Sequence, residues 1–122
     1  PESLSKLNAL CVRKGRTLDL GCGDGAITAA LDGTPVIGLE LAPQCARLAR
    51  RNGLRVTVGD ALGGLPFADG AFDTVYCIDV LHHLHRRWAT IFDELDRVTA
   101  PGGRLILVEP DARRSSSDMG RR

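Results

Sequence analysis

Apolar residues along this chain fall into two kinds of pattern, which alternate along most of its length. Short continuous apolar runs predict buried strands, and apolar residues spaced three or four apart predict helices. The predicted strands are Thr17–Leu20, Val36–Glu40, Arg55–Val58, Phe72–Asp79 and Leu105–Val108. The predicted helices are Ser3–Val12, Ala26–Leu31, Pro43–Arg51 and one that carries Trp88, Ile91, Phe92, Leu95 and Val98 and stops at Pro101-Gly102-Gly103. This alternation predicts an α/β fold with a doubly wound parallel sheet covered on both faces.

The composition is that of an ordinary globular domain. The 122 residues suffice for one core, with 43% apolar and 25% charged residues. A net charge of +1 neither requires nor excludes a nucleic-acid partner, and an aromatic content of 4% argues against a stacking surface for single strands. We expect a core of residues 1–110 and a flexible basic, serine-rich tail of residues 111–122.

The sequence predicts a cytoplasmic protein with reduced cysteines. No apolar run is long enough to span a membrane, and the first residues lack the apolar segment of a secretory signal. The four cysteines are widely spaced and form no C-x-x-C pair, which argues against a zinc site and a disulfide framework.

The first candidate for chemistry is the glycine turn Gly21-x-Gly23-x-Gly25, directly after the first predicted strand. Ligands of open α/β sheets bind at the carboxyl ends of the strands, and glycines let the backbone approach them closely. The spacing G-x-G-x-G differs from the G-x-G-x-x-G of the dinucleotide fingerprint. This difference argues against a nicotinamide oxidoreductase.

Two carboxylates follow the next two predicted strands. Glu40 lies 19 residues beyond Gly21, where a carboxylate can accept hydrogen bonds from both hydroxyls of a ribose; the alternative is a solvated charge at a strand end. Asp60 could accept from an exocyclic amino group such as that of adenine, or it could cap a turn.

Three histidines, His82, His83 and His85, follow the fourth predicted strand. His82 and His83 are adjacent and cannot easily share one helical face, and no cysteine or carboxylate completes a familiar ligand spacing. We therefore expect no metal site here.

Three segments together resemble the motifs of class I S-adenosylmethionine (SAM) dependent methyltransferases. The segment Thr17–Gly25 (TLDLGCGDG) resembles the first motif of that family, and Asp73–His83 (DTVYCIDVLHH) resembles its fourth-strand signature. Leu95–Leu105 (LDRVTAPGGRL) resembles the signature of a subgroup that contains small-molecule and some tRNA methyltransferases. The resemblance implies a Rossmann-like sheet with strand order 3-2-1-4-5 and SAM as the cofactor.

The resemblance also implies a set of cofactor residues at the matching positions. They are Asp19, Gly21, Cys22, Gly23, Glu40, Leu41, Asp60, Ala61 and Asp79. Asp19 and the glycine backbone would hold the methionine portion. Glu40 would bind the ribose hydroxyls and Leu41 would pack against the adenine. Asp60 and the Ala61 N–H would meet the adenine edge.

The acceptor side of the site is implied to begin at Asp79 and His82. A general base is needed only if the acceptor arrives protonated, and His82 or His83 could serve because histidine titrates near neutrality. We expect a small-molecule acceptor, with tRNA or protein left open.

The chain departs from the family after Pro110, where no apolar alternation remains for the usual C-terminal hairpin. It is therefore either a fragment or a minimal form, and the exposed edge of the fifth strand predicts a homodimer or a partner that covers it. The leading function is an active methyltransferase. The alternative is a SAM-binding module without activity, acting as a sensor or beside a catalytic subunit.

Overall fold

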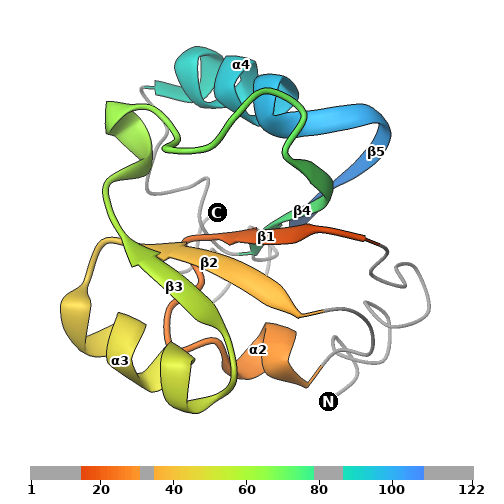
Figure 1. Ribbon diagram of the computed structural model, residues 1–122. Helices are drawn as coiled ribbons and strands as arrows, with labels where there is room; N and C mark the ends of the chain where they lie inside the picture. The colour runs from red at the N-terminus through yellow and green to blue at the C-terminus, as the bar shows by residue number, and fades with distance from the viewer. Residues whose placement is uncertain (1–14, 31–34, 79–86, 109–122) are drawn as a thin grey trace, which may run out of the picture.

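Five parallel strands form one sheet in the order β3-β2-β1-β4-β5, the order that the resemblance implied (Figure 1). The computed structural model describes residues 15–30, 35–78 and 87–108. The strands are β1 (Thr17–Leu20), β2 (Val36–Glu40), β3 (Arg55–Val58), β4 (Phe72–Ile78) and β5 (Thr99–Val108). The helices are α2 (Ala26–Ala29), α3 (Pro43–Arg51), the short 3-10 helix η1 (Ala61–Gly63) and α4 (Trp88–Val98).

Helices cover both faces of the sheet, as a doubly wound fold requires. In Figure 1, α2 and α3 lie on one side of the sheet and α4 lies on the other, with η1 in the loop that follows β3. No helix among the described residues is both long and apolar enough to cross a membrane. The predicted helix Ser3–Val12 and the tail 111–122 lie outside the described residues.

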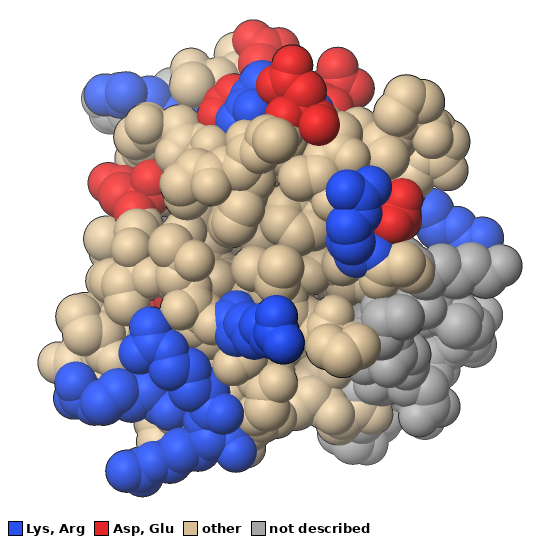
Figure 2. Space-filling model, viewed as in Figure 1, with Lys and Arg blue, Asp and Glu red and all other residues tan. Residues whose placement is uncertain are grey.

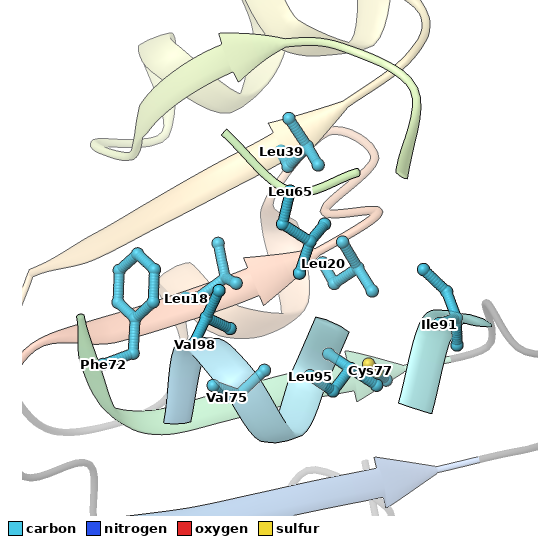
Figure 3. Packing of buried hydrophobic residues seen from close by; sticks show 10 residues of the cluster. All are labelled: Leu18, Leu20, Leu39, Leu65, Phe72, Val75, Cys77, Ile91, Leu95 and Val98. Atoms are coloured by element: carbon cyan, nitrogen blue, oxygen red, sulfur yellow. The ribbon is translucent and has the colours of Figure 1, made fainter. Parts of the chain in front are cut away.

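The core on the α4 side is one apolar cluster that joins the helix to the middle of the sheet (Figure 3). The helix contributes Ile91, Leu95 and Val98, which recur every three or four residues and are fully buried. Facing them are side chains of β1 and β4, and Leu65 joins the same cluster from the loop after β3. This loop is therefore part of the core and not a peripheral connection.

The start of β5 differs from the prediction. The sequence predicted a strand beginning at Leu105, whereas β5 begins at Thr99, directly after α4. Phe72 pairs with Thr99 while Thr74 pairs with Arg104, so the Pro-Gly-Gly segment is an irregular bulge within the pairing of β4 with β5. Proline and glycine are unfavourable inside a regular strand, so their pattern predicts the end of the helix and does not reveal the strand pairing around them.

The outer edge of β5 pairs with no other strand among the described residues. Leu105 and Leu107 on β5 are about two-fifths exposed, at 38% and 43%. The expectation that a second copy or a partner covers this edge stays a prediction.

Charge is unevenly distributed over the surface (Figure 2). Basic side chains gather over α3 and the start of β3, at the lower left of Figure 2, with no acidic residue among them in that view. The arginines of these elements are all exposed: Arg47, Arg50, Arg51 and Arg55. The protein therefore has a local basic patch on α3 and β3, although its net charge is only +1.

The beginning of β1 is fixed to β4 by one carboxylate. Asp73 Oδ2 accepts the main-chain N–H of Arg16 at 2.9 Å, and the Asp73 N–H donates to the Arg16 carbonyl at 2.8 Å. The Arg16 N–H, more than its guanidinium, holds the pKa of Asp73 below its usual range. Gly15 has a φ of +64°, and a Cβ added there would overlap Oδ2 of Asp73.

We predict that Gly15→Ala destabilises the fold more than Gly53→Ala does. Both glycines have positive φ, but a Cβ at Gly53 would meet nothing within 4 Å. Gly53→Ala should therefore cost only the left-handed strain of about 1–2 kcal/mol. Gly15→Ala should cost more, because it also displaces the Asp73 carboxylate. Urea denaturation of both variants measures the difference, and equal costs would contradict the steric argument.

Candidate cofactor-binding site

The predicted cofactor residues that the structure describes lie at the carboxyl ends of β1, β2 and β3 and in the loops that follow them (Figure 1). Gly21, Gly23 and Gly25 all adopt positive φ, between 58° and 74°, so the chain makes a tight turn that other residues would strain. The N–H groups of Gly21 and Cys22 donate to the Leu39 carbonyl, at 2.8 and 3.2 Å. The turn is thus attached to the neighbouring strand β2.

Glu40 joins the three strand ends. Its Oε1 accepts the N–H of Gly23 at 2.7 Å, and its Oε2 accepts the N–H of Ala42 at 2.9 Å. Its main-chain carbonyl accepts the N–H of Gly59 at 3.0 Å, at the start of the loop after β3. The side chain is therefore oriented by two backbone donors. Each carboxylate oxygen still has a lone pair for a further donor.

Asp19 lies beneath the turn and is only 4% exposed. Its Oδ2 accepts the hydroxyl of Thr28, on α2, at 2.8 Å. Sequence reasoning missed Thr28. A buried carboxylate needs hydrogen-bond donors, and the hydroxyl of Thr28, which is itself fully buried nine residues further along the chain, supplies one. The bond holds α2 against the end of β1.

The Cys22 thiol packs into the apolar cluster on the α3 side of the sheet, with Val36, Ala49, Leu54 and Val56. A Cβ added at Gly38 would stand 2.6 Å from its Sγ. Burial, aided by the nearby carboxylates of Asp19 and Glu40, raises the pKa of Cys22 to about 12. The thiol is therefore neutral at physiological pH, and any contact of Cys22 with a ligand falls to its main chain.

Asp60 caps η1, which was the alternative reading of this residue. Its Oδ1 accepts the Leu62 N–H at 2.9 Å, and its carbonyl accepts the Gly63 N–H at 3.1 Å. The side chain is exposed, and Oδ2 makes no hydrogen bond among the described residues. Capping therefore fixes the residue while one oxygen stays available, so the two readings are compatible.

Some predicted site residues are not placed. Asp79, His82 and His83 lie outside the described residues. Among the residues that are described, no group of three histidine, cysteine or acidic side chains could hold a metal ion. A hollow of about 500 Å³ between α4 and β5 contains none of the predicted cofactor residues.

Sequence reasoning also missed the ion pair that holds the loop after β3. All five N–H donors of Arg97 are used, on Glu94, on Asp69 and on two loop carbonyls, at 2.7 to 3.1 Å. Glu94 Oε1 in turn accepts the N–H of Leu65 at 2.7 Å. The i,i+3 spacing of an acid and an arginine on a predicted helix was visible, but their loop partners lie about 30 residues away in the sequence.

Comparison with known proteins identifies the family. Residues 18–107 match the family model described as a methyltransferase domain. The chain belongs to the methyltransferase-domain family. Its sheet order and strand-end motifs are those of a class I methyltransferase, and the cofactor of the domain is SAM.

Individual relatives agree with this assignment. A demethylmenaquinone methyltransferase of Beutenbergia cavernae is 40% identical over 108 residues, 84% of this chain and 44% of the relative. A probable tRNA methyltransferase 9B of Mus musculus is 35% identical over 91 residues, 73% of this chain and 20% of the relative. The crystal structure of a SAM-dependent methyltransferase from Mesorhizobium loti superposes with a TM-score of 0.71 at 26% identity, covering 84% of this chain and 50% of that one. The chain thus spans half or less of the length of these relatives.

We predict that Gly38→Ala disturbs the glycine turn from below. The new Cβ must displace the Cys22 Sγ, and overpacking of this kind costs about 1–3 kcal/mol. The variant should melt at a lower temperature and bind S-adenosylhomocysteine (SAH) more weakly in calorimetric titration. Adding Cys22→Ala to it should restore part of both losses. A double variant no better than Gly38→Ala alone would show that the turn does not depend on this contact.

We also predict an acid-dependent contribution of Glu94 to stability. Hydrogen bonds from Arg97, and then from the Leu65 N–H, lower the pKa of Glu94 to about 2. Folding therefore favours its ionised form, so the stabilisation is full above the ordinary pKa of about 4.3 and is lost as the pH falls towards about 2. In urea denaturation, the difference between the wild type and Glu94→Gln should shrink over this range. Asp93→Asn, exposed on the same helix, is the control, and an equal pH trend in both variants would contradict the prediction.

Proposed function

We propose that the protein transfers the methyl group of SAM to an acceptor by in-line displacement, at a site formed by the glycine turn, Glu40 and the loop after β3. The observation that carries the proposal is the arrangement of Glu40, whose carboxylate is oriented by two backbone N–H groups and keeps acceptor capacity on both oxygens. Two adjacent acceptors of this kind suit the vicinal hydroxyls of a ribose.

The remaining residues extend the site on both sides of the ribose. Asp19 and the glycine backbone are proposed to hold the methionine portion, and Leu41, which is 62% exposed, to pack against the adenine. Asp60 Oδ2 and the Ala61 N–H are proposed to meet the adenine edge. Bound SAM supplies a methyl group already activated by its sulfonium, so the protein's task is to align the acceptor with it, and such alignment can lower a barrier by ~7–11 kcal/mol.

The acceptor is proposed to be a small molecule. The demethylmenaquinone methyltransferase is the more identical of the two curated relatives and matches more of this chain than the tRNA methyltransferase does. The basic patch on α3 and β3 is the feature that suits an RNA acceptor instead, because arginines bind phosphate. His82 or His83 is proposed as the general base where the acceptor must lose a proton.

Glu40→Gln tests the site. A glutamine can accept from only one of the two N–H groups and turns its amide donor towards the other, so SAH affinity should fall about 10- to 100-fold. Asp96→Asn, on α4 away from these residues, should bind like the wild type. Calorimetric titration measures both. Wild-type protein that binds NADH and not SAH would refute the proposal, as would SAH binding that is indifferent to Glu40→Gln.

The activity itself is tested with methyl-labelled SAM. Label should pass to a quinol-type or other small-molecule fraction of a cell extract and not to its RNA. Label in RNA would support the tRNA alternative. Firm SAH binding without a labelled product in any fraction would favour the binding module without activity.

A further inference from the structure

The ion pair of Glu94 and Arg97 lies outside the predicted cofactor residues, yet it holds the loop that carries Asp60 and Ala61. We infer that Glu94 and Arg97 are positioning residues for the adenine side of the cofactor site. This inference rests on the proposed function, because it needs Asp60 and Ala61 to face the adenine.

The contact runs through Leu65, two residues after the end of η1. Its N–H donates to Glu94 Oε1 at 2.7 Å, and its carbonyl accepts from Arg97 Nη2 at 2.9 Å. Its side chain is 5% exposed and lies in the core cluster with Leu20 and Leu39 (Figure 3). Both main-chain polar groups and the side chain of this one residue are therefore fixed.

The other end of the same segment is fixed as well. The Gly59 N–H donates to the Glu40 carbonyl at 3.0 Å, which ties the loop to the end of β2. Asp60 and Ala61 thus lie in a short stretch anchored at both ends, and η1 transmits the position of Leu65 to them. Gly64, between η1 and Leu65, has a φ of +93° and lies beside Glu94. The left-handed turn of the loop is therefore next to the ion pair.

A purely structural role would place the pair in the docking of α4, but the helix has other anchors. Ile91, Leu95 and Val98 attach it to the sheet through the core. Three of the five bonds from Arg97 go to the loop, on the Leu65 and Phe67 carbonyls and on Asp69. Most hydrogen bonds of Arg97 therefore hold the loop, and loss of the pair should displace the loop more than it displaces α4.

Binding of two ligands tests this role. SAH carries adenosine and the amino-acid portion, whereas 5′-methylthioadenosine carries the adenosine alone. Glu94→Gln and Arg97→Lys should each weaken the binding of both ligands by the same factor, about 5- to 30-fold. Asp93→Asn and Arg104→Lys, both at exposed positions, are the matched controls and should bind both ligands like the wild type. Asp19→Asn should weaken the binding of SAH and leave the binding of 5′-methylthioadenosine unchanged.

A double variant separates positioning from general loosening. If Glu94 acts by placing Asp60, the effects of the two substitutions should not be additive. The double variant Asp60→Asn with Glu94→Gln should then bind only slightly more weakly than whichever single variant loses more affinity. Losses that simply multiply would overturn the inference. So would a lower melting temperature of Glu94→Gln and Arg97→Lys with unchanged affinity for both ligands. Wild-type protein that binds neither ligand would instead refute the proposed function.

Discussion

The site depends on one carboxylate that ties three strand ends together. The side chain of Glu40 holds the glycine turn, and its main chain holds the loop after β3. Neither Glu40 nor Asp60 pairs with a lysine or arginine among the described residues; backbone N–H groups orient both instead. Their negative charge is therefore positioned without being neutralised by a basic side chain. Burial first, and then the carboxylates of Asp19 and Glu40, raise the pKa of Cys22. A site of this kind favours a ligand that brings hydroxyl and amino donors and a positive charge, as SAM does.

The loop after β3 meets a second constraint, which is the need to satisfy its backbone. A helix in this position would pair its own N–H and carbonyl groups. In the segment between β3 and β4, however, only the three residues of η1 are helical. Arg97 and Glu94 supply the missing partners, and the Gly70 N–H donates to the Arg97 carbonyl at 2.7 Å. Side chains of α4 thus do for the loop what helical hydrogen bonds would do elsewhere.

The strands and the sheet order could be predicted because apolar runs and glycine turns are local signals, and because parallel strands bring their carboxyl ends to one edge. The same logic predicted that Glu40 lies at the end of β2, and its role towards a ribose stays a prediction. It could not give the direction of the Cys22 side chain, which depends on the space above Gly38, a residue of another strand. It could not give the partners of Arg97 either, since spacing within a helix does not reveal contacts about 30 residues away. The early start of β5 was missed because a bulge hides strand pairing behind Pro-Gly-Gly.

One helix therefore packs the core and holds the loop proposed to line the site, through different sides of its surface. The side that carries Ile91, Leu95 and Val98 builds the core, and the side that carries Glu94 and Arg97 faces the loop. Residues three and four apart on a helix occupy neighbouring rows, so the two roles cannot be separated by a rigid shift of α4. It follows that the loop proposed to form the adenine side of the site takes its position when α4 packs against the sheet. A ligand would then find this wall already formed, and ordering it would not reduce the binding free energy.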